Sequence, residues 1–240
     1  FGETISFSSN EPVEATIFLD GPALLYHVNV NECYDEYPPS PSVRLGLTPV
    51  APAVIYSRTT NFLAALRSVT AQSEMIHVIM DGMAPFEKVE TQVDRFKQIA
   101  IQCDERATNA NKSKHNILHL LAEWAMEEAV RNVKGVQLHR PTFGEAEPYI
   151  DHFIQQQNIE NVLIMSGDSD FFVYPHCPGF VPFCGLEWKR EENEKPMSTI
   201  VSLTAIHYLS SKFWKAYIPY NPRIATAIAA LAGCDYGNAM

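Results

Sequence analysis

Short apolar runs alternate along the chain with longer segments whose apolar residues recur at helical spacing. Residues 16–19, 75–80 and 162–165 are nearly continuous apolar runs that are too short for a typical helix. Residues 54–69 and both ends of 86–133 instead place apolar side chains three and four positions apart. Buried strands that alternate with helices are typical of a parallel sheet with helices on its faces. The pattern therefore predicts an α/β fold of three layers, with a mostly parallel central sheet covered by helices.

The remaining segments fit the same plan. Residues 135–158 predict a short strand, a loop and a helix, and the polar centre of 86–133 predicts two helices joined by a flexible tip. The apolar spacing of 202–214 and 221–240 predicts helices that close the fold. No internal repeat and no linker composition interrupts this pattern, so we expect a single domain over residues 1–240.

Composition narrows the class of protein. The chain has 240 residues, of which 46% are hydrophobic and 19% charged, as in a globular protein with a sizeable core. No apolar run reaches the ~18 residues that a membrane span needs, and the first residues do not have the pattern of a secretory signal. The cysteines are scattered and contain no C-x-x-C pair, which indicates reduced thiols inside a cell rather than a disulfide framework or a zinc site. They are Cys33, Cys103, Cys177, Cys184 and Cys234.

The net charge is −10. A protein that simply coats nucleic acid is basic, because it neutralises phosphates with lysine and arginine. The charge argues against such a protein, but it leaves open an enzyme whose negative charge is concentrated in a metal-binding cleft.

Acidic residues follow three of the predicted strands. Asp20, Asp81 and the pair Asp168 and Asp170 stand at strand ends, where parallel sheets carry their functional groups. In an extended segment, residues two positions apart point to the same side, so Asp168 and Asp170 can face one ligand. Taken singly, each aspartate is more simply explained as a turn residue or a helix cap.

Three further acids complete the set. Glu145 and Glu147 open a predicted helix, and Asp235 lies near the last residue of the chain. Carboxylates that converge repel one another unless cations neutralise them, and oxygen-only ligands select Mg²⁺, Mn²⁺ or Ca²⁺. Two such ions ~4 Å apart form the two-metal-ion site of many enzymes that hydrolyse phosphodiesters. The acids as a group therefore favour a metal-dependent hydrolase.

Five motifs resemble, in order, the sequence blocks of the flap endonuclease and XPG-type nucleases, which have a PIN-like fold. They are "LDGPALLY", "IMDGMAPFEKVETQVDR", "GEAEPYIDHF", "SGDSDFFVY" and "LAGCDYG", and the resemblance extends over most of the chain, from about residue 15 to 237. The resemblance implies a structure-specific nuclease with two ions of Mg²⁺ or Mn²⁺. The ligand set that it implies is Asp20, Asp81, Glu145, Glu147, Asp168, Asp170 and Asp235.

Two basic residues match the family as well. Lys88 lies seven positions after Asp81, and Arg95 seven positions after Lys88. In the family these positions begin a helical arch and hold the scissile phosphate, so we expect Lys88 and Arg95 to act in catalysis together with Asp81 and Asp168. Seven residues are nearly two helical turns, which places both basic side chains on one helix face with no packing role. The alternative is an ordinary solvated helix with charge pairs, but the matching register favours the functional interpretation.

Residues 173–188, "VYPHCPGFVPFCGLEW", look most like the asteroid subfamily, and the proline-rich stretch 32–52 also fits a divergent member. Two departures are visible. The opening "FGETISFSSN" differs from the family's Met-Gly-Ile-x-Gly-Leu block, and the given chain stops five residues after Asp235, before the family's helix-two-turn-helix.

The resemblance therefore implies a metal-dependent endonuclease that hydrolyses phosphodiesters of DNA with single-stranded or branched character. DNA is the favoured partner, with RNA possible and no membrane, and we expect an intracellular, nuclear role of the DNA-repair type. The alternative is a protein that keeps the fold as a scaffold or RNA regulator without the activity. The presence of all seven acids favours the enzyme. The basic pair and the chain length argue against a third possibility, a small PIN-type ribonuclease.

Overall fold

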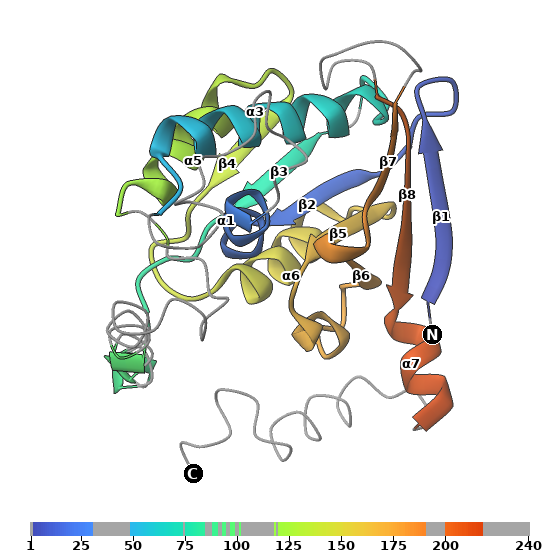
Figure 1. Ribbon diagram of the computed structural model, residues 1–240. Coiled ribbons are helices and arrows are strands. Elements are labelled where there is room, and N and C mark those ends of the chain that lie inside the picture. Colours follow the sequence, from blue (N-terminus) through green and yellow to red (C-terminus); the bar gives the residue numbers. More distant parts are fainter. Residues whose placement is uncertain are drawn as a thin grey trace.

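One central sheet of eight strands organises the chain (Figure 1). The computed structural model describes residues 2–30, 49–73, 75–84, 88–90, 93–94, 97–98, 101, 118, 120–190 and 200–217. The strands are β1 (Gly2–Ser8), β2 (Thr16–Asp20), β3 (Ile76–Ile79), β4 (Val136–His139), β5 (Val162–Ser166), β6 (Gly179–Pro182), β7 (Glu187–Arg190) and β8 (Ile200–Leu209). The helices are α1 (Gly21–Val30), α3 (Pro52–Ser68), α5 (Ala122–Asn132), α6 (Ala146–Gln157) and α7 (Ser210–Tyr217), with short 3-10 helices η3 (Ser169–Phe172) and η4 (Phe183–Gly185).

The strand order is β1-β8-β6-β5-β2-β3-β4, and β7 pairs with β8 beside this path. From β6 to β4 all neighbouring strands are parallel, so their carboxyl ends lie at one edge of the sheet. Strands β1, β6 and β7 each pair with β8 in the antiparallel direction. The mostly parallel sheet that the sequence predicts is confirmed, with an antiparallel extension on one side.

Helices cover both faces of the parallel strands, which makes three layers. Helices α3 and α5 lie above the sheet in Figure 1 and α6 lies below it. Side chains of one strand alternate between the two faces. In β2, Ile17 and Leu19 belong to the core between the sheet and helices α1, α3 and α5, whereas Phe18 belongs to the smaller core on the face that α6 covers. This alternation explains why each short apolar run is buried almost completely on both sides.

The predicted strands at 16–19, 75–80, after 135 and at 162–165, and the helix predicted over 54–69, agree with the structure. The helix predicted over 202–214 is confirmed only from Ser210 on, where α7 begins, and is wrong before it. Residues 200–209 form β8, which pairs with β1 over seven residue pairs. Leu203 and Ala205 are buried while their neighbours are less so, which is the alternation of a strand. Apolar spacing alone could not separate the two structures here, because the strand partner is almost 200 positions away along the chain.

Other predictions fall partly outside the described residues. The positions described between 88 and 101 are helical or begin a helix, and α5 matches the second helix predicted within 86–133. Most of the predicted tip between them and the helix predicted over 221–240 lie outside the described residues. Among the described residues, no helix is both long and apolar enough to cross a membrane.

Candidate active site

An acidic cleft of about 460 Å³ opens at the carboxyl edge of the parallel strands. Five of the seven predicted acidic residues line it, and they come from the ends of β2, β3 and β5 and from the beginning of α6. They are Asp20, Asp81, Glu145, Glu147 and Asp168. Parallel strands bring them together, because residues that follow different strands then meet at the same edge.

A glycine follows two of these aspartates, and both glycines are required by close backbone approach. A Cβ on Gly21 would lie 2.3 Å from the Met80 sulfur and 2.7 Å from the Ile79 carbonyl oxygen. A Cβ on Gly82 would lie 2.4 Å from the carbonyl oxygen of Pro141. The two Asp-Gly pairs thus let neighbouring strand ends pack closely enough to share one cleft.

Asp20 is buried at the end of β2 and is held by its neighbours. Ser166, at the end of adjacent strand β5, donates a hydrogen bond of 2.5 Å to Asp20 Oδ2, and the Ala23 backbone N–H lies 3.4 Å from Oδ1. Burial raises the pKa of Asp20 to about 6, although both hydrogen bonds favour the carboxylate. The charges of Asp81 and Asp168 raise it further. Asp20 therefore carries its charge at a cost unless a cation lies nearby.

Asp81 caps a helix that is distant in sequence. Its Oδ1 accepts a 3.0 Å hydrogen bond from the backbone N–H of Ala146, the first residue of α6. The positive end of the helix dipole favours a carboxylate at this position. Burial nevertheless raises the pKa of Asp81, and the nearby charge of Glu145 adds to this while that of Lys88 opposes it.

Lys88, in the segment after β3, pairs with one of the acids that line the cleft. Its Nζ donates to Glu145 Oε1 at 2.6 Å, and its side chain is only 8% exposed. The sequence-based expectation that Lys88 has no packing role is therefore wrong. The segment that carries Lys88 lies against the beginning of α6, and that approach depends on residues 57 positions apart.

Glu147, in the first turn of α6, has a buried carboxylate oxygen without a protein partner. Its Oε2 makes no hydrogen bond within the described structure. Burial raises the pKa of Glu147 to about 8, and repulsion from Asp20, Glu145 and Asp81 contributes in the same direction. A buried acceptor of this kind is costly unless a proton or a cation satisfies it.

Asp168 lies at the cleft, but Asp170 is arranged differently from the extended pair that the sequence predicts. A 3-10 helix begins at Ser169, and Asp168 caps it by accepting a 2.9 Å hydrogen bond from the Asp170 backbone N–H. Residues two positions apart therefore do not project in parallel here. Asp170 is exposed and is absent from the described lining of the cleft. Its role as a ligand stays a prediction.

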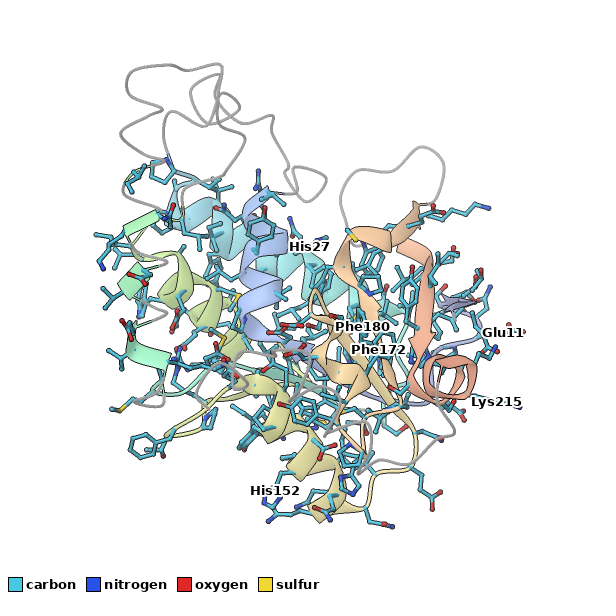
Figure 2. The ribbon with its side chains drawn as sticks, turned by 90° about the horizontal axis from the view of Figure 1, so that it is seen from below. Glu11, His27, His152, Phe172, Phe180 and Lys215 are labelled. Carbon is cyan, nitrogen blue, oxygen red and sulfur yellow. The ribbon has the colours of Figure 1, made fainter. Side chains whose placement is uncertain are left out.

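Two further site predictions, Arg95 and Asp235, lie outside the described residues. Residues that the sequence analysis missed also contribute to the cleft. Phe180 of β6 forms part of its wall, and its ring packs edge-on against Phe172 of η3 with centroids 5.2 Å apart (Figure 2). Ser166 and Arg140 contact the acidic residues directly, and both follow the rule that placed the aspartates, because each lies at or just after the end of a parallel strand.

The donor set fits divalent cations. The cleft holds the carboxylates of five residues, and one oxygen of Glu147 has no hydrogen-bond partner among the described residues. Burial and, to a lesser extent, the neighbouring carboxylates raise the pKa values of Asp20 and Glu147. Hard cations such as Mg²⁺ and Mn²⁺ prefer oxygen ligands of this type. Within the described ranges, no three histidine, cysteine or acidic side chains are already arranged around one point as a coordination site.

Comparison with protein-family models and with curated protein sequences gives no match. Solved structures do match. The catalytic core of Rad2 in complex with DNA substrate gives a TM-score of 0.55 at 14% identity, covering 97% of this chain and 60% of that chain. A second Rad2 complex gives 0.51 at 14% identity, covering 98% of this chain and 58% of that one. Human GEN1 in complex with Holliday junction DNA gives 0.46 at 13% identity, covering 97% of this chain and 48% of that one.

The two Rad2 comparisons show the fold: the chain has the mixed α/β architecture of that catalytic core. This agrees with the flap-endonuclease-like, PIN-like fold predicted from the sequence. The chain spans about 60% of the Rad2 structures that it matches.

Proposed function

We propose that the protein is a metal-dependent nuclease that hydrolyses phosphodiester bonds of DNA with single-stranded or branched character. The observation that carries the proposal is the gathering of five carboxylates in one cleft at the carboxyl edge of the sheet, with an unsatisfied buried oxygen on Glu147. A cleft for an uncharged or anionic small molecule would not gain from this concentration of negative charge.

Asp20, Asp81, Glu145, Glu147 and Asp168 would hold two cations of Mg²⁺ or Mn²⁺, and Asp170 and Asp235 are proposed to complete the set. Such cations lower the pKa of water and stabilise negative charge on a phosphate. Ser166 keeps Asp20 oriented through its hydrogen bond, and the N-terminus of α6 does so for Asp81. Lys88 adds a positive charge at the edge of the cleft, where it can contact a phosphate oxygen, and Arg95 is proposed to act beside it.

DNA is favoured as the substrate because the Rad2 structures of the same fold are described in complex with DNA substrate. Preference for branched or single-stranded DNA, the kinship with the asteroid subfamily and a nuclear role in DNA repair rest on the sequence motifs. The proposal of a single domain over residues 1–240 rests on the uninterrupted pattern of predicted elements.

The proposal is tested by cleavage of labelled flap, overhang, single-stranded and duplex DNA, with matched RNA strands, in Mg²⁺, Mn²⁺ or EDTA. We expect cleavage of substrates that contain single-stranded DNA, dependent on the divalent cation and abolished in Asp168→Asn. Lys97→Ala is the matched surface control, because Lys97 is exposed and pairs only locally with Asp94 among the described contacts. Cleavage that persists in EDTA, or in Asp168→Asn, would contradict the metal-dependent site.

A second candidate is a scaffold that binds branched nucleic acid without cleaving it. It is the alternative that the sequence analysis leaves open. Binding of flap DNA by the wild type, with no cleavage in either cation and no thermal response to them, would support this candidate.

A further inference from the structure

Arg140 links the acidic cleft to helix α5. It is the first residue after β4, and its Nη1 donates a 2.8 Å hydrogen bond to the backbone carbonyl of Asp81. Its Nε donates to Glu127 Oε1 at 3.1 Å, and its Nη2 contacts both Glu127 and Glu123. One guanidinium thus joins a strand-end backbone to two carboxylates of a helix.

The Asp81 carbonyl lies where the regular sheet has ended. The pairing of β3 with β4 stops at Ile79 and His139, and one further bond runs from the Met80 N–H to the His139 carbonyl. Beyond this bond, Arg140 supplies a side-chain donor for the carbonyl of the following residue, Asp81. The guanidinium therefore extends the link between the two strand ends by one residue.

Asp81 is consequently held on two sides by one short segment. Its carbonyl accepts from Arg140 and its carboxylate accepts from the Ala146 backbone N–H. Between these contacts, the Gly82 N–H donates to the Gly144 carbonyl at 2.8 Å. The backbone rotation that would turn the Asp81 carboxylate out of the cleft would break these contacts together.

The other end of the guanidinium is anchored firmly. The Glu127 side chain is only 11% exposed and is also held by Arg131, whose Nη2 lies 2.8 Å from Glu127 Oε2. Helix α5 itself packs on α3 and on β4. Arg140 therefore ties Asp81 to a helix of the core.

We propose that Arg140 is a positioning residue for Asp81, and that it sets the affinity of the cleft for divalent cations by holding the Asp81 carboxylate toward them. This inference rests on the proposed function, because it takes Asp81 as a cation ligand. The role requires an arginine. A planar guanidinium can donate to a carbonyl on one side and to carboxylates on the other, whereas an ammonium is a point charge on a flexible stem.

The test is Mn²⁺ binding, measured by titration without any nucleic acid, together with the melting temperature in EDTA. The variants are Arg140→Lys and Arg140→Met. The matched control is Arg131→Met, which removes the other arginine on Glu127 without touching Asp81 in any described contact. We expect Arg140→Lys and Arg140→Met to weaken Mn²⁺ binding about 10-fold or more, the scale of lost outer contacts to metal ligands. Arg131→Met should lower the melting temperature while its Mn²⁺ affinity stays within about twofold of the wild type, because no cation ligand moves.

Arg140→Lys keeps the positive charge near Glu127, so it should recover part of the stability that Arg140→Met loses but none of the Mn²⁺ affinity. Unchanged Mn²⁺ affinity in Arg140→Lys and Arg140→Met, with the wild type binding Mn²⁺ normally, would overturn the positioning role and leave the proposed function standing. Equal weakening in Arg131→Met would also overturn it, because general loosening of α5 would then explain the result. A wild type that binds no Mn²⁺ would overturn the proposed function and this inference together.

Discussion

Replacement of Lys88 by methionine tests whether this side chain is a buried ion-pair partner, as the structure shows, or an exposed surface residue, as the sequence pattern predicts. Methionine keeps an unbranched apolar stem of similar length and removes the ammonium group. If Lys88 were an ordinary surface residue of the arch, its replacement would lower the free energy of unfolding by at most about 0.5 kcal/mol. The structure instead places its Nζ 2.6 Å from Glu145 Oε1, with the two side chains 8% and 28% exposed.

The expected loss of stability follows from that burial. Breaking a fully buried pair costs about 3–5 kcal/mol, and an exposed pair contributes about 0.2–1 kcal/mol. Because Glu145 keeps more than a quarter of its exposure, we expect a loss of about 1–3 kcal/mol for Lys88→Met. For a domain of this size, that corresponds to a drop of roughly 2–12 °C in the melting temperature. Lys97→Met is the control, and its melting temperature should stay close to that of the wild type because its pair with Asp94 is exposed on both sides.

Metal binding and cleavage should move in opposite directions in the same variant. Without the ammonium, the net charge of the site becomes more negative, so Mn²⁺ should bind several-fold more tightly. Single-turnover cleavage should nevertheless fall about 100-fold if Lys88 stabilises charge on the phosphate. The assays are thermal melting in EDTA, Mn²⁺ titration and single-turnover cleavage of a labelled flap. A melting temperature equal to that of the wild type, or weaker Mn²⁺ binding, would refute this reasoning.

Three further predictions concern the cleft and its frame. Burial raises the pKa of Asp20 to about 6 and that of Glu147 to about 8, so the folded protein binds these protons more tightly than the unfolded chain does. The stabilisation is complete below the pKa values that these groups have in the unfolded chain, and it is lost as the pH rises through about 6 and then about 8. The melting temperature in EDTA should fall over this pH range, and Glu147→Gln should reduce the fall near pH 8. Ser166→Ala should cost about 1–3 kcal/mol in urea unfolding and raise the pKa of Asp20 further, because a buried hydrogen bond to the carboxylate is lost; an unchanged midpoint would contradict this. Gly82→Ala should cost about 1–3 kcal/mol because its Cβ meets a backbone oxygen at 2.4 Å, whereas Gly185→Ala, with its nearest atom at 3.8 Å, should be tolerated; equal melting temperatures would show that the strand ends are not packed as described.

The apolar pattern of the sequence was sufficient to predict β2, β3, β4 and β5 and the helices that cover them, but not the fifth parallel strand, β6. Runs such as 162–165 are buried on both faces, so their apolar character is continuous and short, and this distinguishes them from the longer helical pattern of 54–69. The meeting of the strand-end acids could also be predicted. Parallel strands share one direction, so residues that follow them must arrive at the same edge whatever the details of packing.

The tertiary structure decided the features that depend on partners far along the chain. Residues 200–209 have an apolar pattern that fits either a helix or a strand, and pairing with β1 and β7 made them a strand. Asp170 departs from the predicted pair because a 3-10 helix begins directly after Asp168. No local pattern announces the strand, because it depends on which backbone groups find partners elsewhere, whereas the turn after Asp168 is closed by a local hydrogen bond from the Asp170 N–H.

The environment of individual side chains was likewise decided only by the fold. Lys88 meets Glu145 across 57 positions, and Arg140 meets Asp81 across 59 positions. In sequence each is one charged residue among polar neighbours. Burial and charge pairing are set by the surfaces that the folded chain brings together, so the sequence could determine which edge of the sheet carries the acids, while the tertiary contacts determined how each acid is held there.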